Sequence, residues 1–407
     1  MFTDKPQITE HARTIPVIEE VDVLVVGGGP AGVCAALSAG RCGLRVLLIE
    51  RYNHLGGLWT GGLVLPLLAT HAVDKNGDLQ QAVFGIGAEI IERLRTMGMA
   101  ERDIDPIVDP EATKYLFDAM MNEEDIKILY NVWASNVIMD GNRIDAVILE
   151  SKSGRVGVRG KMVIDTTGDG DIFAFAGEDF KNLPYHIGLV HRLGNTDRID
   201  RAAPGFSANK SGKGTAVPGV NWVNMRGEDG SDGLDLYVLS ELTHRYRMCI
   251  WEQVQVMRTQ PGYEKVFLLD TASQLGVRVT RLLKGQYTLT LEDSMTFRRF
   301  EDPIGYCGSW RAINYKGKTV KRENRPIWQI PLRSLIPVKT ENLLTAGRCF
   351  SYEPAHAEDG RIMSAAVVTG HAAGAAAAAS LQTRTSVQKV PYTEVKNVLL
   401  EQKAYLG

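Results

Sequence analysis

The spacing of hydrophobic and polar residues predicts strands and helices in alternation. Residues 21–26 (VDVLVV) form an apolar run with the length of a buried strand, and the small residues that follow predict a helix. A second apolar run at residues 45–49 predicts the next strand. A strand, a helix and a strand in this order are typical of a parallel sheet covered by helices, so we expect an α/β fold.

Three later segments carry apolar residues at helical spacing, and we expect helices at residues 80–97, 109–121 and 239–257. Apolar and polar residues alternate over residues 126–149, and the Asp-Gly-Asn sequence at 140–142 interrupts them, which predicts a hairpin. The chain therefore continues as a mixture of sheet and helix.

The C-terminal part is predicted to return to the first unit. Residues 161–164 and 342–346 predict short strands, and residues 361–380 predict a helix of small residues that can pack tightly on a sheet. Residues 362–381 are long enough for a membrane span, but they contain His371 and are dominated by alanine. We expect a packed core helix instead.

The first chemical signal is the turn after the strand at residues 21–26. Gly27 permits a tight turn, Gly29 lets the backbone approach a pyrophosphate, and Gly32 lets the helix lie close to the strand. The N–H groups at the helix start then face the phosphates. Glu50 stands 18 residues after Gly32, where a carboxylate can accept both hydroxyls of an adenosine ribose. The contacts expected from this unit are Gly27, Gly28, Gly29, Pro30, Ala31, Gly32, Glu50 and Arg51.

Two further glycine-rich segments are candidate cofactor contacts. Residues 56–60 lie where the chain must pass close to a bound dinucleotide, which glycine permits. Residues 165–171 (DTTGDGD) follow a predicted strand, and their acids lack the spacing of a calcium loop. The residues expected to take part are Gly56, Gly57, Thr60, Thr167 and Gly168.

Charge and composition favour a small-molecule partner. The formal net charge of −2 gives no overall field that would attract nucleic acid or an anionic membrane. The basic run at residues 311–325 is predicted to be a solvated hairpin. Residues 201–235 are rich in Gly, Ser, Pro and Asn and lack the spacing of a phosphate-binding loop, so we expect a mobile surface loop or lid.

The sequence predicts no metal site. The five cysteines include no C-x-x-C pair, and the eight histidines show no H-E-x-x-H or paired-ligand spacing. Covalent attachment of a cofactor through His54 or His71 stays open. The polar residues 1–16 contain no apolar segment typical of a secretory signal, so we expect a cytoplasmic protein.

The chain resembles FAD-dependent oxidoreductases of the glutathione-reductase-like class, and more narrowly a bacterial group distantly related to fumarate-reductase flavoproteins. The resemblance covers nearly the whole chain and rests on VVGGGPAG with Glu50, GGLWTGG, VIDTTGDGD, HRLGNTD, GVRVTRLLKGQYTL, IPLRSLIP and ENLLTAGRCFSYEPAHAEDGRIMSAA. It implies FAD, bound by a Rossmann-like domain of residues 18–177 and 333–382. Residues 178–332 would form an inserted α+β substrate domain, and residues 383–407 a C-terminal tail.

The same resemblance implies further site residues. One residue would lie near the adenine, a Gly-Arg turn would approach the ribityl-pyrophosphate, and a helix N-terminus would reach the pyrimidine end of the flavin. In that order, these residues are Ala134, Gly347 and Arg348, and Arg361, Ile362 and Met363.

We expect the chemistry on the loop at residues 352–361. His356 is the candidate general base, because imidazole titrates near neutral pH and this loop enters the helix expected at the flavin. Arg278 and Arg281 would share one face of a helical turn and bind a substrate carboxylate or stabilise negative charge on reduced flavin. The alternatives are that His356 only caps the helix and that the arginines pair with nearby acids.

Two functions fit these features. The first is an enzyme that transfers a hydride between a small organic substrate and N5 of FAD, with an external electron acceptor or donor. The second is a flavoprotein subunit that relays electrons or uses FAD structurally within a larger complex. The sequence lacks an iron–sulfur motif, which weighs against relay. A homo-oligomer is left open, and we expect no nucleic-acid or membrane partner.

Overall fold

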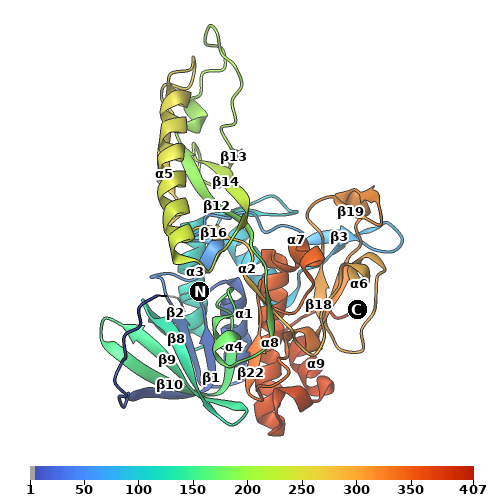
Figure 1. Cartoon of the computed structure of the whole chain (residues 1–407). Helices are drawn as coiled ribbons and strands as arrows, with labels where there is room; N and C mark the ends of the chain where they lie inside the picture. The colour runs from blue at the N-terminus through green and yellow to red at the C-terminus, as the bar shows by residue number, and fades with distance from the viewer. Residues whose placement is uncertain (1–4) are drawn as a thin grey trace.

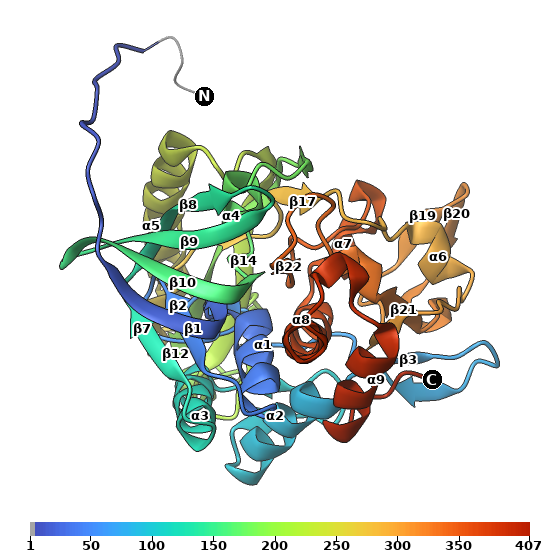
Figure 2. The same cartoon turned by 90° about the horizontal axis from the view of Figure 1, so that it is seen from below.

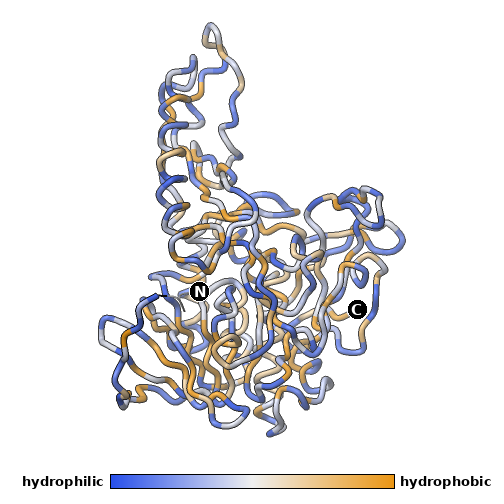
Figure 3. Tube along the Cα trace, in the orientation of Figure 1, coloured by the Kyte–Doolittle hydropathy of each residue, from blue (hydrophilic) through white to orange (hydrophobic). Residues whose placement is uncertain are grey.

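The computed structural model describes residues 5–407, apart from the side chains of Met225 and Arg226. Within this part, seven strands form the main sheet, with β7, β2, β1, β10 and β22 parallel and β9 and β8 added as an antiparallel edge. The bounds are β1 Val17–Val26, β2 Val46–Glu50, β7 Lys127–Tyr130, β8 Trp133–Asp140, β9 Arg143–Ser151, β10 Gly154–Asp165 and β22 Leu343–Thr345. Figures 1 and 3 show this sheet, whose strands are largely hydrophobic. The predicted parallel α/β core and the hairpin are confirmed.

Helix α1 (Pro30–Gly40) follows β1 directly, and helix α8 (Met363–Thr383) packs against it (Figure 2). Two glycines of α8 allow this close approach. A Cβ at Gly370 would lie 2.1 Å from the carbonyl oxygen of Ala31, and a Cβ at Gly374 would lie 2.3 Å from that of Ala35. The most apolar window of α8 is 94% buried, so the predicted core helix is confirmed.

Helices α2 (Gly85–Thr96) and α3 (Pro110–Glu123) pack beside α1. The Asp109 carboxylate accepts a hydrogen bond from the Ala112 N–H and caps α3, and the Asp-Pro sequence at 109–110 is typical of such a helix start. Helix α2 begins later than predicted, because residues 79–81 pair with residues 71–73 in an antiparallel hairpin.

A second sheet and helix α5 (Leu236–Arg258) form an arm that projects from the core (Figure 1). The sheet runs β13-β14-β12-β15, with β16 also paired to β12. Its bounds are β12 Tyr185–Gly194, β13 Lys213–Gly214, β14 Asn221–Ser231, β15 Phe267–Thr271 and β16 Gly276–Val277. The predicted helix at residues 239–257 is confirmed as α5.

The prediction of a loop at residues 201–235 is wrong for β14. This strand pairs with β12 from Tyr185 opposite Ser231 to Leu193 opposite Asn221. The side chain of Trp222 is buried, and its indole N–H donates to the carbonyl oxygen of Leu63 over 2.6 Å. Main-chain pairing and one buried aromatic ring therefore hold this segment as a strand, although its Gly- and Asn-rich composition predicted a loop.

The remaining chain packs on the other side of α8. The predicted solvated hairpin is present as β19 and β20, but Arg325, from the same basic run, is buried in an ion pair with Asp359. Residues Val395 and Leu399 of α9 are buried in the main core, although this segment was expected to be a tail. The other elements are β3 His71–Val73, β4 Leu79–Gln81, β5 Ala100–Glu101, β6 Ile107–Val108, α4 Asp171–Phe175, β11 Phe180–Asn182, β17 Arg281–Leu283, α6 Leu291–Met295, β18 Pro303–Cys307, β19 Ile313–Tyr315, β20 Lys318–Val320, β21 Trp328–Pro331, α7 Ala357–Gly360 and α9 Tyr392–Glu401.

Candidate cofactor site

A cavity of about 1050 Å³, its open mouth included, lies at the carboxyl ends of β1, β2 and β10. Its position, outside the carboxyl ends of parallel strands, is where α/β sheets bind nucleotides. The predicted residues that line it are Gly27, Gly29, Pro30, Ala31, Glu50, Arg51, Gly57, Ala134, Thr167, Gly168, Gly347, Arg348, Arg361 and Met363.

The other predicted cofactor residues lie behind this lining. At Gly32 a Cβ would lie 1.8 Å from the carbonyl oxygen of Gly27, so this glycine sets the contact between helix and turn. Gly56 has a φ of 96°, and the Thr60 hydroxyl donates to the carbonyl oxygen of Leu55, so both shape a tight turn. The remaining two are Gly28, which bonds the side chain of Glu50, and Ile362, the N-cap residue of α8.

Glu50 is fixed at the end of β2 with its carboxylate at the cavity. Its Oε2 accepts from the Gly28 N–H at 2.7 Å, and its Oε1 accepts from the Tyr52 N–H at 2.9 Å. Each carboxylate oxygen keeps further acceptor capacity. The side chain is therefore held ready to accept hydrogen bonds from a pair of hydroxyls.

Two helix N-termini meet at the cavity. Neither Gly29, the N-cap of α1, nor Ile362, the N-cap of α8, provides a side-chain cap. Pro30 and Ala31 of α1 and Met363 of α8 line the cavity. Free N–H groups and the positive ends of both helix dipoles favour a bound anion such as a pyrophosphate.

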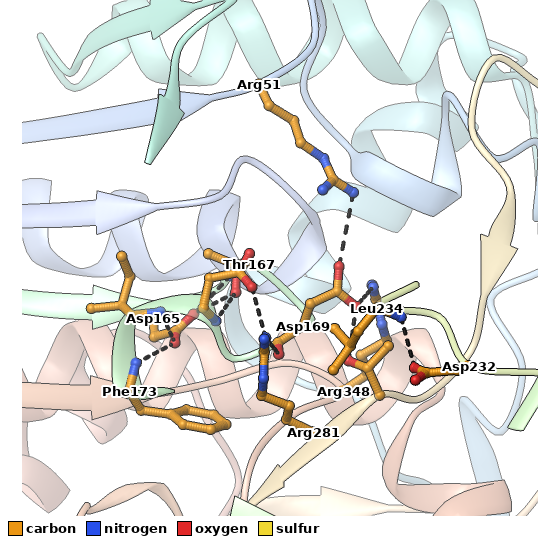
Figure 4. A network of polar contacts seen from close by, with 12 residues as sticks. Arg51, Asp165, Thr167, Asp169, Phe173, Asp232, Leu234, Arg281 and Arg348 are labelled. Atoms are coloured by element: carbon orange, nitrogen blue, oxygen red, sulfur yellow. Dashed lines mark hydrogen bonds and ion pairs between the residues drawn. The ribbon is translucent and has the colours of Figure 1, made fainter. Parts of the chain in front are cut away.

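The DTTGDGD turn is organised by the buried carboxylate of Asp165. Its oxygens accept from the N–H and hydroxyl of Thr167 and from the N–H groups of Ile172 and Phe173 (Figure 4). Burial raises the pKa of Asp165 to about 6. The four hydrogen bonds hold the turn that presents Thr167 and Gly168 to the cavity.

Asp169 lies between two arginines at the site, and the sequence did not single it out. It accepts from Arg348 Nη2 at 2.7 Å and lies 3.9 Å from Arg51 Nη2 (Figure 4). Burial opposes its charged form, but the guanidinium groups of Arg348 and Arg51 hold its pKa below the usual value. Asp169 follows Gly168 directly, so its place in the glycine-rich turn was the available signal.

Arg278 and Arg281 do not share a helical face. They follow β16 and begin β17, in extended chain rather than in a helical turn, because this segment pairs with strands on two sides. Arg281 bonds Asp171 at 2.8 Å and the carbonyl oxygen of Asp169 at 2.9 Å. The DTTGDGD turn therefore binds the guanidinium of Arg281. Arg278 takes no part in these contacts.

Arg278 is a half-buried cation beside a second cation. Burial and the nearby positive charge of Arg361 lower the pKa of Arg278 to about 10. Within residues 5–407, no carboxylate forms a hydrogen bond or ion pair with its guanidinium. Glu358, the nearest acid, bonds Arg361 at 2.8 Å and also accepts from the hydroxyl of Tyr185.

His356 does not reach the cavity. Its ring is 1% exposed and packs edge-on against Trp328, with ring centroids 4.6 Å apart. In the described part of the chain, neither ring nitrogen has a hydrogen-bond partner. Burial lowers the pKa of His356 to about 3, which makes it a poor proton acceptor at neutral pH. The geometry therefore argues against the predicted role as general base, because the short 3₁₀ helix Pro354–His356 holds this side chain in the core.

The cavity fits a dinucleotide such as FAD. A Cβ at Gly29 would meet nothing within 4 Å, so the backbone there is open to a close ligand. Among the described residues, the buried Nε atoms of Arg348 and Arg361 have no hydrogen-bond partner, and both side chains line the cavity. The site therefore combines uncapped helix starts and two open guanidinium N–H donors for phosphate with a carboxylate for a ribose.

Comparison with known proteins agrees with this geometry. The family model described as FAD dependent oxidoreductase matches residues 22–188 and 190–399. The chain belongs to this family. As a member of this family it is a FAD-dependent oxidoreductase, and its cofactor is FAD.

Two curated relatives of this FAD-dependent oxidoreductase are archaeal. The thiamine thiazole synthase of Methanococcus vannielii is 30% identical over 165 residues, which is 37% of this chain and 56% of that protein. The digeranylgeranylglycerophospholipid reductase of Picrophilus torridus is 30% identical over 163 residues, or 36% and 39% of the two chains. The chain thus spans about half the length of the curated relatives it matches, or less.

Two solved structures are also similar. A geranylgeranyl bacteriochlorophyll reductase-like protein from Thermoplasma acidophilum gives a TM-score of 0.47 at 15% identity, over 95% of this chain and 84% of that chain. The p-nitrophenol 4-monooxygenase of Pseudomonas putida gives a TM-score of 0.47 at 14% identity, over 94% and 86%.

Replacing Glu50 with alanine should weaken FAD binding by roughly 2–4 kcal/mol, because two charge-assisted hydrogen bonds to the ribose are lost. Glu50→Gln, which keeps one acceptor, should lie between the wild type and Glu50→Ala. Titrating FAD into the apoprotein and following flavin fluorescence measures both. Glu20→Ala, at an exposed acid of β1, is the control. Wild-type affinity in Glu50→Ala would rule out this contact.

Replacing His356 with phenylalanine should make the fold less sensitive to acid. The folded-state pKa of His356 lies below the ordinary value of about 6.5, so the unfolded chain takes up a proton that the folded chain refuses. His356 therefore destabilises the fold progressively as the pH falls from about 6.5 towards 3. Urea unfolding at about pH 7 and about pH 5 measures the difference.

The exposed His11 offers a control, since His11→Gln should keep the wild-type pH dependence. His356→Phe should also reduce FAD at the wild-type rate in single-turnover experiments, because its ring is outside the cavity. If the change in unfolding free energy between the two pH values is the same in His356→Phe as in the wild type, His356 is not held in its neutral form by burial. A large loss of the flavin-reduction rate in this variant would restore His356 as the base.

Proposed function

We propose that this FAD-dependent oxidoreductase transfers a hydride between flavin N5 and a small organic substrate that carries a carboxylate. When bound, FAD supplies N5 as the hydride acceptor or donor. The observation that carries the proposal is the unmatched cation Arg278 beside Arg361, a residue that lines the cavity. The proposal adds a substrate class to the oxidoreductase activity of the family.

The argument for a carboxylate rests on charge. A half-buried guanidinium next to a second one is unfavourable unless an anion neutralises it. The two acids that act on Arg278 are engaged elsewhere, since Glu358 bonds Arg361 and Asp229 bonds His186. Asp169 and Asp171 bond Arg348 and Arg281. Arginine binds carboxylates through two parallel N–H donors, so a substrate carboxylate fits the remaining demand.

The lining residues would hold FAD along the cavity. Glu50 would accept the ribose hydroxyls, and the turn at Gly27 and Gly29 with the start of α1 would bind the pyrophosphate. Ala134, beside Trp133 and Val132 in the lining, would lie at the adenine. Met363 and the start of α8 would face the pyrimidine end of the flavin, which places Arg361 between flavin and substrate.

We propose the Tyr185–Glu358 pair as the group that moves the substrate proton. An alcohol or amine donor must lose a proton when its hydride leaves. Burial and the hydrogen bond to Glu358 raise the pKa of Tyr185 to about 12. Burial opposes the charged form of Glu358, but Arg361 and the Tyr185 hydroxyl keep its pKa below the usual value. The hydroxyl of Tyr185 would accept the substrate's proton while its own proton passes to the weakly basic carboxylate of Glu358, and both protons would move back in the reverse reaction.

We also propose a glutathione-reductase-like subclass, distantly related to fumarate-reductase flavoproteins and of bacterial type. Its FAD domain would comprise residues 18–177 and 333–382, with residues 178–332 as the inserted substrate domain. The pairing of β22 with β10 supports the return of the chain, and the second sheet supports the insertion. An external electron acceptor or donor, a cytoplasmic location and the absence of nucleic-acid and membrane partners stay predictions.

Anaerobic mixing of the FAD-loaded protein with small carboxylic acids, and with their matched amides, tests the substrate class. The acids should bleach the oxidised flavin, or bind and perturb its absorbance, and the amides should not. Arg278→Gln should raise the KM or dissociation constant for the acids at least about 10-fold and leave FAD affinity unchanged. Arg198→Gln, at an exposed arginine near the arm, is the control. Equal response to acids and amides would refute the carboxylate without affecting the FAD assignment.

Replacing Tyr185 with phenylalanine should slow flavin reduction by roughly 10²–10⁴-fold, the range of a lost general acid or base. FAD and the carboxylate should still bind, because the phenyl ring keeps the packing of Tyr185. Stopped-flow absorbance at saturating substrate measures the step. A Tyr185→Phe variant that reduces flavin at the wild-type rate would exclude this proton route.

A further inference from the structure

The outer face of α5 carries a regular stripe of side chains that are exposed or, at Gln255, partly exposed. Its inner face packs on the second sheet through Leu242, Tyr246, Ile250 and Val254. On the outer face, residues at alternating spacings of three and four recur, which is the spacing of a helix–helix seam. We call these residues the outer stripe, and they are Glu241, His244, Met248, Trp251, Gln255 and Arg258.

The centre of the outer stripe is apolar although it faces solvent. The side chains of Met248 and Trp251 are 50% and 54% exposed, and Leu269 on β15 is 41% exposed. These three residues line one shallow groove together with Arg247 and Asp270. The arm holds α5 away from the core, so this face is accessible (Figure 1). Hydrophilic and hydrophobic residues alternate along the helix (Figure 3). Adjacent large apolar side chains on an accessible face mark an interaction surface.

The charges along the outer stripe complement those of a second, antiparallel copy. With a two-fold axis between residues 249 and 250, Met248 meets Trp251 of the second copy, and Glu241 meets Arg258 of the second copy. His244 then meets Gln255 of the second copy. Each of these contacts occurs twice, because a two-fold interface is self-complementary.

A parallel arrangement would have the opposite effect. It would place Glu241 against Glu241 and Arg258 against Arg258, which is repulsive. A lipid surface also fits less well, because the stripe mixes both signs of charge instead of presenting a basic face.

We propose that two copies of this chain associate through antiparallel α5 helices, with Met248 and Trp251 at the centre and the Glu241–Arg258 pairs at the ends. The three-and-four spacing predicts left-handed packing of the two helices at a shallow crossing angle. Leu269, on β15, flanks the seam. This inference rests on the arm alone and is independent of the proposed substrate.

Size-exclusion chromatography with light scattering on the full FAD-loaded chain tests the dimer. The wild type should be a dimer, and Trp251→Glu should weaken association at least about 10-fold, because a buried aromatic anchor becomes a charge. Leu400→Glu changes an equally exposed apolar residue on α9 and should leave the dimer intact. Retained flavin absorbance shows that each variant is folded.

A charge-reversal pair makes the test specific for the antiparallel register. Glu241→Arg and Arg258→Glu should each weaken the dimer a few-fold, and the double variant should restore it. Within one helix Glu241 bonds Arg245 and lies too far from Arg258, so only contact between copies can produce the rescue. A monomeric wild type, no rescue in the double variant, or Trp251-dependent binding to phospholipid vesicles by a monomer would each overturn the proposal.

Discussion

The cofactor cavity depends on main-chain segments that approach one another with no side chain between them. A Cβ at Gly27 would lie 2.5 Å from the carbonyl oxygen of Thr166, which fixes the turn after β1 against the turn after β10. Gly32 brings α1 onto that turn, and Gly370 and Gly374 bring α8 onto α1. Larger side chains at these places would separate the helices, and their two N-termini would no longer open onto one cavity.

The buried charges follow from the same close packing. The Asp165 carboxylate accepts hydrogen bonds from the backbone of its own turn, and Asp169 bonds the guanidinium of Arg348. Asp171 forms an ion pair with Arg281. These three acids are thus committed to holding the protein, and among the described residues no carboxylate bonds Arg278. The fold therefore leaves a positive charge on one side of the cavity, which an anionic ligand can neutralise.

The parts of this structure that the sequence predicts are those decided by neighbouring residues. The strand, turn and helix around Gly27, the acid at Glu50 and the cap at Asp109 each depend on a few consecutive side chains. Strand β14 was missed because its evidence is main-chain pairing with β12, which composition does not record. His356 was misplaced because Trp328, distant in the chain, buries it. The partner of Asp169 was likewise invisible, since Arg348 comes from the far end of the chain.

The order of the elements along the chain has a consequence for synthesis. Helix α8 covers α1 and completes the cavity, yet it is made only after the whole arm. Until α8 leaves the ribosome, the small-residue face of α1 has no partner and stays exposed to aggregation or chaperone binding. Contacts between distant parts of a chain also form slowly. Retention of FAD by a nascent chain would therefore mark the moment at which α8 has been made.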